Sequence, residues 1–130
     1  MTAGTELRAL LRDLAPSLHP EPFVFASVHR VPEDATPVAM VAEEEGLTVV
    51  LSQADAERLA LPHQFPAAMI TLRVRSALDS VGLTAAVAGV LADAGISCNV
   101  MAGYHHDHLF VPFELRREAM SALLRLAGQQ

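Results

Sequence analysis

Apolar residues recur along this chain in two alternating patterns, one helical and one extended. Leucines between positions 7 and 14 recur at helical spacing and predict a helix over residues 5–14, with Thr5 as its N-cap and Pro16 as its stop. Runs rich in β-branched and aromatic residues predict strands at 23–31, 38–43, 47–51, 69–74, 96–102 and 108–113. Further helical patterns cover residues 53–61, 83–94 and 114–127.

The order of these elements divides the chain into two halves. Residues 62–66 lie between two prolines and form the best internal boundary, which gives halves of 1–64 and 65–130. The second half reads β-α-β-β-α, the split βαβ or ferredoxin-like order without its last strand. We expect a strand from the first half to complete that sheet, so that the halves interleave. The predicted fold class is therefore α+β, with antiparallel sheets and helices packed on one face.

Composition narrows the classes of partner. The chain has 130 residues, which suits one domain or two small halves sharing a core, and its formal charge is −6. It contains no basic block, so we expect no nucleic-acid partner, and no long apolar run, so we expect no membrane partner. The N-terminus lacks the apolar core of a signal peptide, which predicts a cytoplasmic protein. A single cysteine, Cys98, excludes an internal disulfide and a cysteine-based zinc cluster.

The most informative stretch runs from Ser76 to Pro112, where a glycine loop opens an apolar helix beside a sheet edge. Gly82 allows a positive φ or a close backbone approach, and the next two residues would present free N–H groups at the helix start. The α-carboxylate of a free amino acid fits such a site. Its ammonium group needs acceptors, for which we expect Asn99, the backbone near Val100 and, as the charged partner, Asp107.

This stretch resembles an ACT domain, and most of the chain is similar to short bacterial proteins with paired ACT-like halves. The family's Asp-x-Pro-Gly-Leu pattern stands here as residues 79–83, with Val81 in place of proline, and the helix ends in the family's Gly95-Ile96 step. Residues 45–48 resemble a motif of the first half in those proteins. The resemblance implies a ferredoxin-like fold, binding of a free amino acid or similar small molecule, and a ligand pocket between two ACT units. The ligand-binding residues expected from the loop and the resemblance together are Ser76, Asp79, Val81, Gly82, Leu83, Thr84, Asn99, Val100 and Asp107.

The predicted function is that of a non-catalytic regulatory or sensor domain, without a cofactor or metal, that forms a homodimer and acts on a regulated enzyme partner. One alternative is a protein interaction module whose glycine loop is only structural. Another is a metal-dependent enzyme that uses the cluster from His105 to His108. The purely structural interpretation of that cluster is a polar hairpin turn without a metal, because neighbouring residues on a strand point to opposite faces.

We expect no functional role for two other groups of residues. Cys98 is expected to be a buried, inert thiol, and residues 43–45 a solvated hairpin tip. No nucleophile elbow, phosphate-binding loop or dinucleotide fingerprint is present in the sequence, which lowers the expectation of catalysis.

Overall fold

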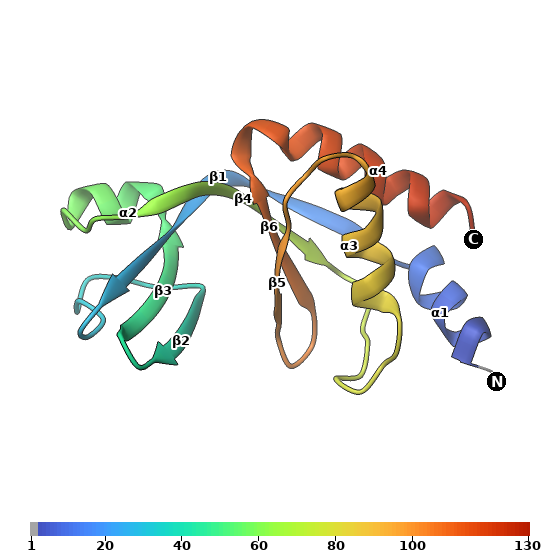
Figure 1. Ribbon diagram of the computed structural model, residues 1–130, viewed down its shortest axis with the longest axis horizontal. Coiled ribbons are helices and arrows are strands. Elements are labelled where there is room, and N and C mark those ends of the chain that lie inside the picture. The colour runs from blue at the N-terminus through green and yellow to red at the C-terminus, as the bar shows by residue number, and fades with distance from the viewer. Residues whose placement is uncertain (1–2) are drawn as a thin grey trace.

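Six strands form a single antiparallel sheet in the computed structural model, which describes residues 3–130 (Figure 1). The strands are β1 (Pro16–Val28), β2 (Ala39–Glu43), β3 (Gly46–Ser52), β4 (Gln64–Leu72), β5 (Asn99–Ala102) and β6 (Asp107–Pro112). The helices are α1 (Ala3–Arg12), α2 (Gln53–Arg58), α3 (Leu83–Asp93) and α4 (Arg116–Gly128), the last preceded by a 3-10 turn over Phe113–Leu115. The fold is α+β with the ferredoxin-like arrangement and its helices on one face, as the sequence predicts.

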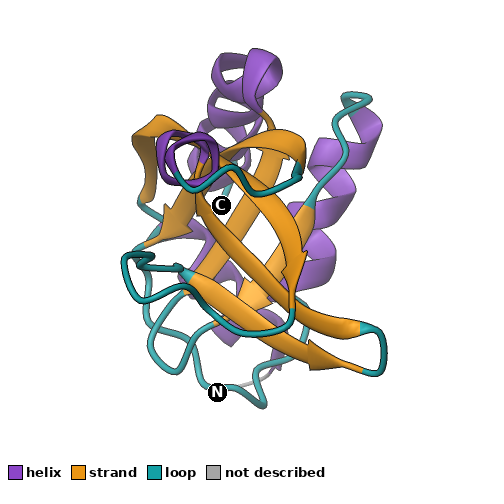
Figure 2. Cartoon of the chain, turned by 90° about the vertical axis from the view of Figure 1, so that its left-hand side faces the viewer, coloured by secondary structure: helices purple, strands orange, loops and turns teal. Residues whose placement is uncertain are grey.

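The two central strands serve both halves of the chain. The strand order is β2-β3-β1-β4-β6-β5, so β1 and β4 lie side by side in the middle. β1 pairs with β3 of its own half on one side and with β4 on the other, which supplies the strand that the second half lacks. β4 does the same for the first half. Figure 2 shows the strong twist that the strands acquire across this sheet.

β1 is longer than the sequence pattern indicates and contains three prolines. The pattern places the strand at 23–31 and uses Pro20 and Pro22 as its boundary, but β1 begins at Pro16. Pairing with β3 starts only at Phe23, so the earlier prolines lie where β1 has one neighbour. A proline on the side of β1 without a neighbouring strand leaves no ladder hydrogen bond unmade, which is why edges tolerate it. The strand register with β4 also shifts between Leu18 and Pro22, which absorbs three residues into a bulge.

Three further boundaries differ from the expectation. The proposed linker at 62–66 is partly strand, because β4 begins at Gln64 and its left-handed Phe65 (φ 61°) forms a second irregularity opposite β1. Thr5 lies inside α1 and does not cap it, since the helix begins at Ala3. The strand expected at 96–102 is shorter, beginning at Asn99.

The helix-covered face of the sheet carries most of the core. Alternate residues of β4 and β6, including Ile70, Leu72 and Leu109, pack beneath α1, α3 and α4. A second cluster lies between α2 and the strands β1 and β3. The opposite face has no helix over it in the described chain, yet it holds a third apolar cluster that includes Phe23, Met69 and Phe110.

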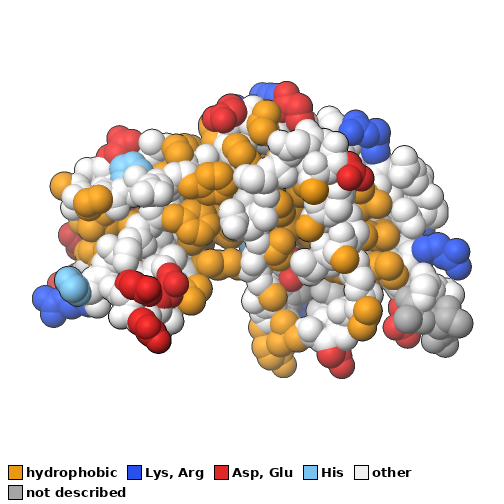
Figure 3. Space-filling model, viewed as in Figure 1, with side chains coloured by type: hydrophobic (Ala, Val, Ile, Leu, Met, Phe, Trp, Pro, Cys, Tyr) orange, Lys and Arg blue, Asp and Glu red, His pale blue; other side chains and the backbone are white. Residues whose placement is uncertain are grey.

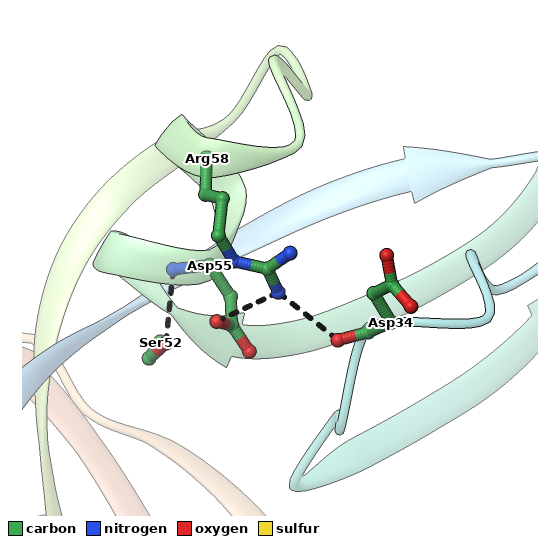
Figure 4. A network of polar contacts seen from close by, with 4 residues as sticks. All are labelled: Asp34, Ser52, Asp55 and Arg58. Atoms are coloured by element: carbon green, nitrogen blue, oxygen red, sulfur yellow. Dashed lines mark hydrogen bonds and ion pairs between the residues drawn. The ribbon is translucent and has the colours of Figure 1, made fainter.

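A loop over residues 29–38 replaces, in the first half, the helix that follows the first strand in the second half. The side chain of Arg58 holds this loop against α2, because its Nη2 donates to the backbone oxygen of Asp34 at 3.0 Å and to Asp55 Oδ1 at 3.1 Å (Figure 4). The Ser52 hydroxyl accepts from the Asp55 amide at 3.1 Å and thereby caps α2.

Candidate functional site

The glycine loop over residues 76–84, called here the Gly82 loop, joins β4 to α3. Gly82 is the N-cap of α3 and has a φ of 101°, in the left-handed region that side chains rarely adopt. A Cβ atom at Gly82 would lie 2.9 Å from Cδ2 of Leu7, so α1 closes over the loop from one side. No side chain caps α3 within the described chain. The amides of Leu83 and Thr84 have no partner within the helix, because they belong to its first turn.

Part of the predicted site lines one small cavity beside this loop. The cavity has a volume of about 70 Å³ and is lined by residues from the loop, the start of α3 and the β5–β6 turn. Four predicted site residues contribute to it: Ser76, Leu83, Thr84 and Asp107. Ligand pockets in proteins usually measure roughly 300–1,000 Å³. The cavity of one chain can therefore hold the charged groups of an amino acid but not the whole molecule.

A second hollow lies on the other side of the same loop, against α1. It measures about 260 Å³ and is lined in part by Asp79 and Val81, two more of the predicted residues. The two hollows share Ala77 and Ser80. Between them the loop exposes two large apolar side chains, Leu78 at 69% and Val81 at 78%.

The structure does not bring the other predicted residues to this loop. Asn99 pairs with Phe110, and directly opposed residues share a face, so Asn99 lies on the helix-free face of the sheet. Val100 is partly buried against the helix-covered core. Asp107 pairs with Ala102, and both line the small cavity. Asn99 and Asp107 therefore point to opposite sides of the sheet.

The cluster from His105 to His108 is divided between the two faces in the same way. His106 and His108 line a cavity on the helix-free face, whereas Asp107 between them faces the Gly82 loop. Within residues 3–130, no group of three or more His, Cys, Asp or Glu side chains converges as metal ligands would. Since the cluster is divided between two faces, the metal-dependent alternative gains no support from its geometry.

Sequence reasoning did not single out the buried polar residue at the centre of the helix-free face. Thr71 is 3% exposed, and its Oγ1 lies 2.9 Å from His108 Nδ1 and 3.3 Å from His19 Nε2. Burial lowers the pKa of His108, and the neighbouring His106 and His19 lower it further, while Asp107 acts in the opposite direction. The signal available in the sequence was a hydroxyl near the end of the otherwise apolar run that precedes Arg73.

Cys98 has the character of a structural thiol. It is only partly buried, not fully buried as expected, and packs against the helix-covered core; this burial raises the pKa of the thiol to about 11. A thiol with so high a pKa carries almost no thiolate at neutral pH, which makes it a poor nucleophile. In the part of the chain that the structure describes, no helix has the length and apolar character needed to cross a bilayer.

Comparison with known proteins identifies both halves. Residues 2–68 match one ACT domain model and residues 64–125 match another. No curated protein matches the chain. A Vibrio cholerae protein of unknown function, described as a possible transport protein, is 40% identical over 97% of this chain and 99% of its own, with a TM-score of 0.86.

More distant structures share the fold. An Agrobacterium tumefaciens protein is 18% identical with a TM-score of 0.69, covering 82% of this chain and 84% of its own. The ligand-free regulatory subunit of aspartate kinase from Thermus thermophilus is 11% identical with a TM-score of 0.63, covering 88% of this chain and 94% of its own. With an ACT match on each half and the shared strand arrangement described above, the chain belongs to the ACT domain family and carries two ACT domains in tandem.

Proposed function

We propose that this protein is a non-catalytic regulatory module that binds a free amino acid at the Gly82 loop and passes the binding event to an enzyme partner. The observation that carries the proposal is the left-handed Gly82 at the start of α3, with Asp107 lining the cavity beside it. ACT domains generally bind small ligands such as amino acids and regulate enzymes, which supports this role.

The chemistry of the loop suits an α-amino acid. The α-carboxylate accepts from the amides of Leu83 and Thr84, where the positive end of the α3 dipole also favours an anion. The ammonium group pairs with the carboxylate of Asp107, which lines the same cavity as Ser76 and Thr84. Amide donors for the carboxylate and an Asp107 carboxylate for the ammonium group together favour a zwitterion over a simple acid or a simple amine.

Because the cavity is too small for the whole ligand, the proposal includes self-association of the chain. About 70 Å³ accommodates the charged groups only, so the ligand's side chain extends toward the exposed loop surface. Leu78 and Val81 form an apolar rim there that a second copy of the chain would cover. Ligand and partner copy would then stabilise each other, because each binds the arrangement that the other favours.

Thermal unfolding in the presence of each standard amino acid tests the site. A ligand at 100 times its Kd should raise the free energy of unfolding by about 2.7 kcal/mol, which is a shift of several degrees. The Asp107→Ala variant should lose that shift, whereas Asp93→Ala should keep it, because Asp93 is an exposed carboxylate at the far end of α3. Loss of the shift in both variants, or in neither, would remove Asp107 from the site.

The interaction-module alternative makes the opposite prediction. It expects no shift with any amino acid and a stable complex with a host protein. Sedimentation equilibrium of the wild type and of Val81→Asp, with and without the active amino acid, tests the dimer. A monomer at every concentration, with ligand bound, would retain the amino-acid site but contradict its completion by a second copy.

A further inference from the structure

A larger cavity lies on the helix-free face of the sheet. It shares Ala102 and Gly103 with the small cavity beside the Gly82 loop, but the polar groups that line it are of a different kind. It measures about 570 Å³, within the range of roughly 300–1,000 Å³ typical of small-molecule sites. Its lining comes from both halves, with the start of β2 on one side and the β5–β6 hairpin on the other. Figure 3 shows the molecule hollowed along its lower edge between these two hairpins. We call it the histidine cavity, after His19, His106 and His108 in its lining.

The floor of the histidine cavity is a chain of hydrogen-bonded side chains from three adjacent strands. His19 of β1, Thr71 of β4 and His108 of β6 are joined through the buried hydroxyl of Thr71. A hydroxyl has one proton, so Thr71 can donate to at most one of the two ring nitrogens, and at least one ring must donate to it. This arrangement fixes the orientation of both rings. Valine has nearly the same shape as threonine and would fill the position without any polar partner, so packing alone does not account for the chain.

The remaining polar groups at this cavity are cationic or capable of becoming so. Arg73 also lines the cavity and makes no ion pair with any residue from 3 to 130. His106 borders it as well, with Nδ1 3.5 Å from the Val74 oxygen. None of the residues that line the cavity in the described chain is Asp or Glu. The carboxylate nearest in sequence, Asp107, faces the other side of the sheet.

The walls between these groups are apolar and deformable. Met69, Met101 and Phe110 line the cavity, and thioether side chains adapt readily to ligands of irregular shape. The lining therefore offers an apolar body site next to donors for a negative charge. It contains no carboxylate that could pair with an ammonium group.

We propose that the histidine cavity binds a small organic carboxylate with a branched or otherwise apolar body and no ammonium group. Arg73 pairs with the carboxylate, the imidazoles held by Thr71 complete its hydrogen bonds, and the methionines enclose the body. This site differs from the one at the Gly82 loop in lining charge and in the class of molecule it accepts, although Ala102 and Gly103 border both cavities.

Three compounds that share one carbon skeleton test the selectivity by isothermal titration calorimetry. 4-Methylpentanoate has the carboxylate alone, leucine adds the ammonium group, and 4-methylpentan-1-ol lacks the charge. We expect 4-methylpentanoate to bind, and both the alcohol and leucine to bind at least about tenfold more weakly, because a charge-assisted hydrogen bond is lost or a charge is left unpaired. No heat of binding from 4-methylpentanoate at millimolar concentration would overturn the proposal, as would equal affinity for leucine.

Matched variants place the binding. Arg73→Gln and Thr71→Val should each weaken 4-methylpentanoate binding by about tenfold, whereas Arg75→Gln should not, because this exposed arginine two residues later is outside the lining. Ring signals of His19 and His108 in NMR spectra of the wild type should shift on binding, and those of the exposed His105 should not. Binding that survives Arg73→Gln, or that disappears with Asp107→Ala and leaves the two histidine signals unmoved, would assign the compound to another site.

Discussion

The two halves of this protein repeat one strand arrangement and fill it with opposite chemistry. The fifth cross-strand pair of β1 with β3 is Ser27 opposite Thr48, and the fifth pair of β4 with β6 is Thr71 opposite His108. Ser27 and Thr48 line a cavity of about 630 Å³ with Glu43, whose carboxylate accepts a hydrogen bond from Thr48. The corresponding pair in the second half lines the histidine cavity with Arg73. The two halves share the strand arrangement, but the pair in the first half lies beside an acidic side chain and the pair in the second half beside a basic one.

The segments that follow the first strand of each half differ as well. In the second half this segment forms the Gly82 loop and α3, and the amides in the first turn of α3 lie beside a cavity. In the first half it is the loop at 29–38, which Arg58 ties to α2. A pinned loop without a helix start offers no comparable anion site, so the amino-acid function proposed above belongs to one half only. On that proposal, the repeated fold carries the amino-acid site only once.

The largest expected effect concerns the shared sheet. We propose that the halves 1–64 and 65–130 fold as one unit, because β1 of the first half pairs with β4 of the second half in the middle of the sheet. Ile70→Ala empties a fully buried position in β4 and should lower the free energy of unfolding by about 2–5 kcal/mol. Leu124→Ala, at an exposed position of α4, should change it by less than about 0.5 kcal/mol.

Urea unfolding followed by far-ultraviolet circular dichroism and by the ring NMR signals of His108 measures both values. His108 lies on β6 in the second half, and its ring is hydrogen-bonded to the buried Thr71, while the dichroism reports on both halves. The two probes should give coincident curves in the wild type and in Ile70→Ala. Separate midpoints would mean that the halves unfold independently in spite of the shared strands.

A smaller effect distinguishes two glycines of the same helix. Gly82→Ala places a side chain at a φ of 101° and brings its Cβ within 2.9 Å of Leu7, so it should cost about 1–3 kcal/mol. Gly89→Ala lies in the interior of α3 with open space around it and should stabilise the protein by about 0.5–1 kcal/mol. Urea midpoints of the two variants should therefore move in opposite directions. A neutral Gly82→Ala would show that the loop relaxes easily and does not hold a fixed anion site.

The sequence predicted the elements and their order because each carries a local signal. The period of the leucines in α1, the β-branched runs of the strands and Ser52 before α2 all reflect interactions between near neighbours. The ends of β1 and β4 were missed for a different reason. Whether a proline is tolerated depends on which side of the strand has a neighbour, and that is decided by pairing between distant segments.

The candidate sites divide along the same line. Gly82 and the start of α3 were found because a glycine before an apolar helix is a local signal. Asn99 was expected beside Asp107 but lies on the other face, because the β5–β6 register sets Asn99 opposite Phe110 and Asp107 opposite Ala102. The chain from His19 to Thr71 to His108 joins residues 52 and 37 positions apart. No local pattern could have brought them together.

The smallest expected effect is the pH dependence that the histidine cavity adds to stability. His108 faces His19, His106 and Arg73 in this cavity and has Asp107 as its neighbour on the other face. Its pKa lies below the ordinary value of 6.5, chiefly because of burial, so the unfolded chain binds the proton more tightly than the native state does. The contribution of His108 to the free energy of unfolding is therefore complete above the unfolded pKa and is lost as the pH falls through and below 6.5.

Urea midpoints between pH 7.5 and 5.5 should decrease more steeply for the wild type than for His108→Gln, which cannot titrate. The comparison of slopes remains valid if the glutamine also lowers stability at every pH. Equal slopes would mean that the histidine cavity hydrates the protonated ring as well as bulk water does, and that it is more open to solvent than the carboxylate site proposed above requires.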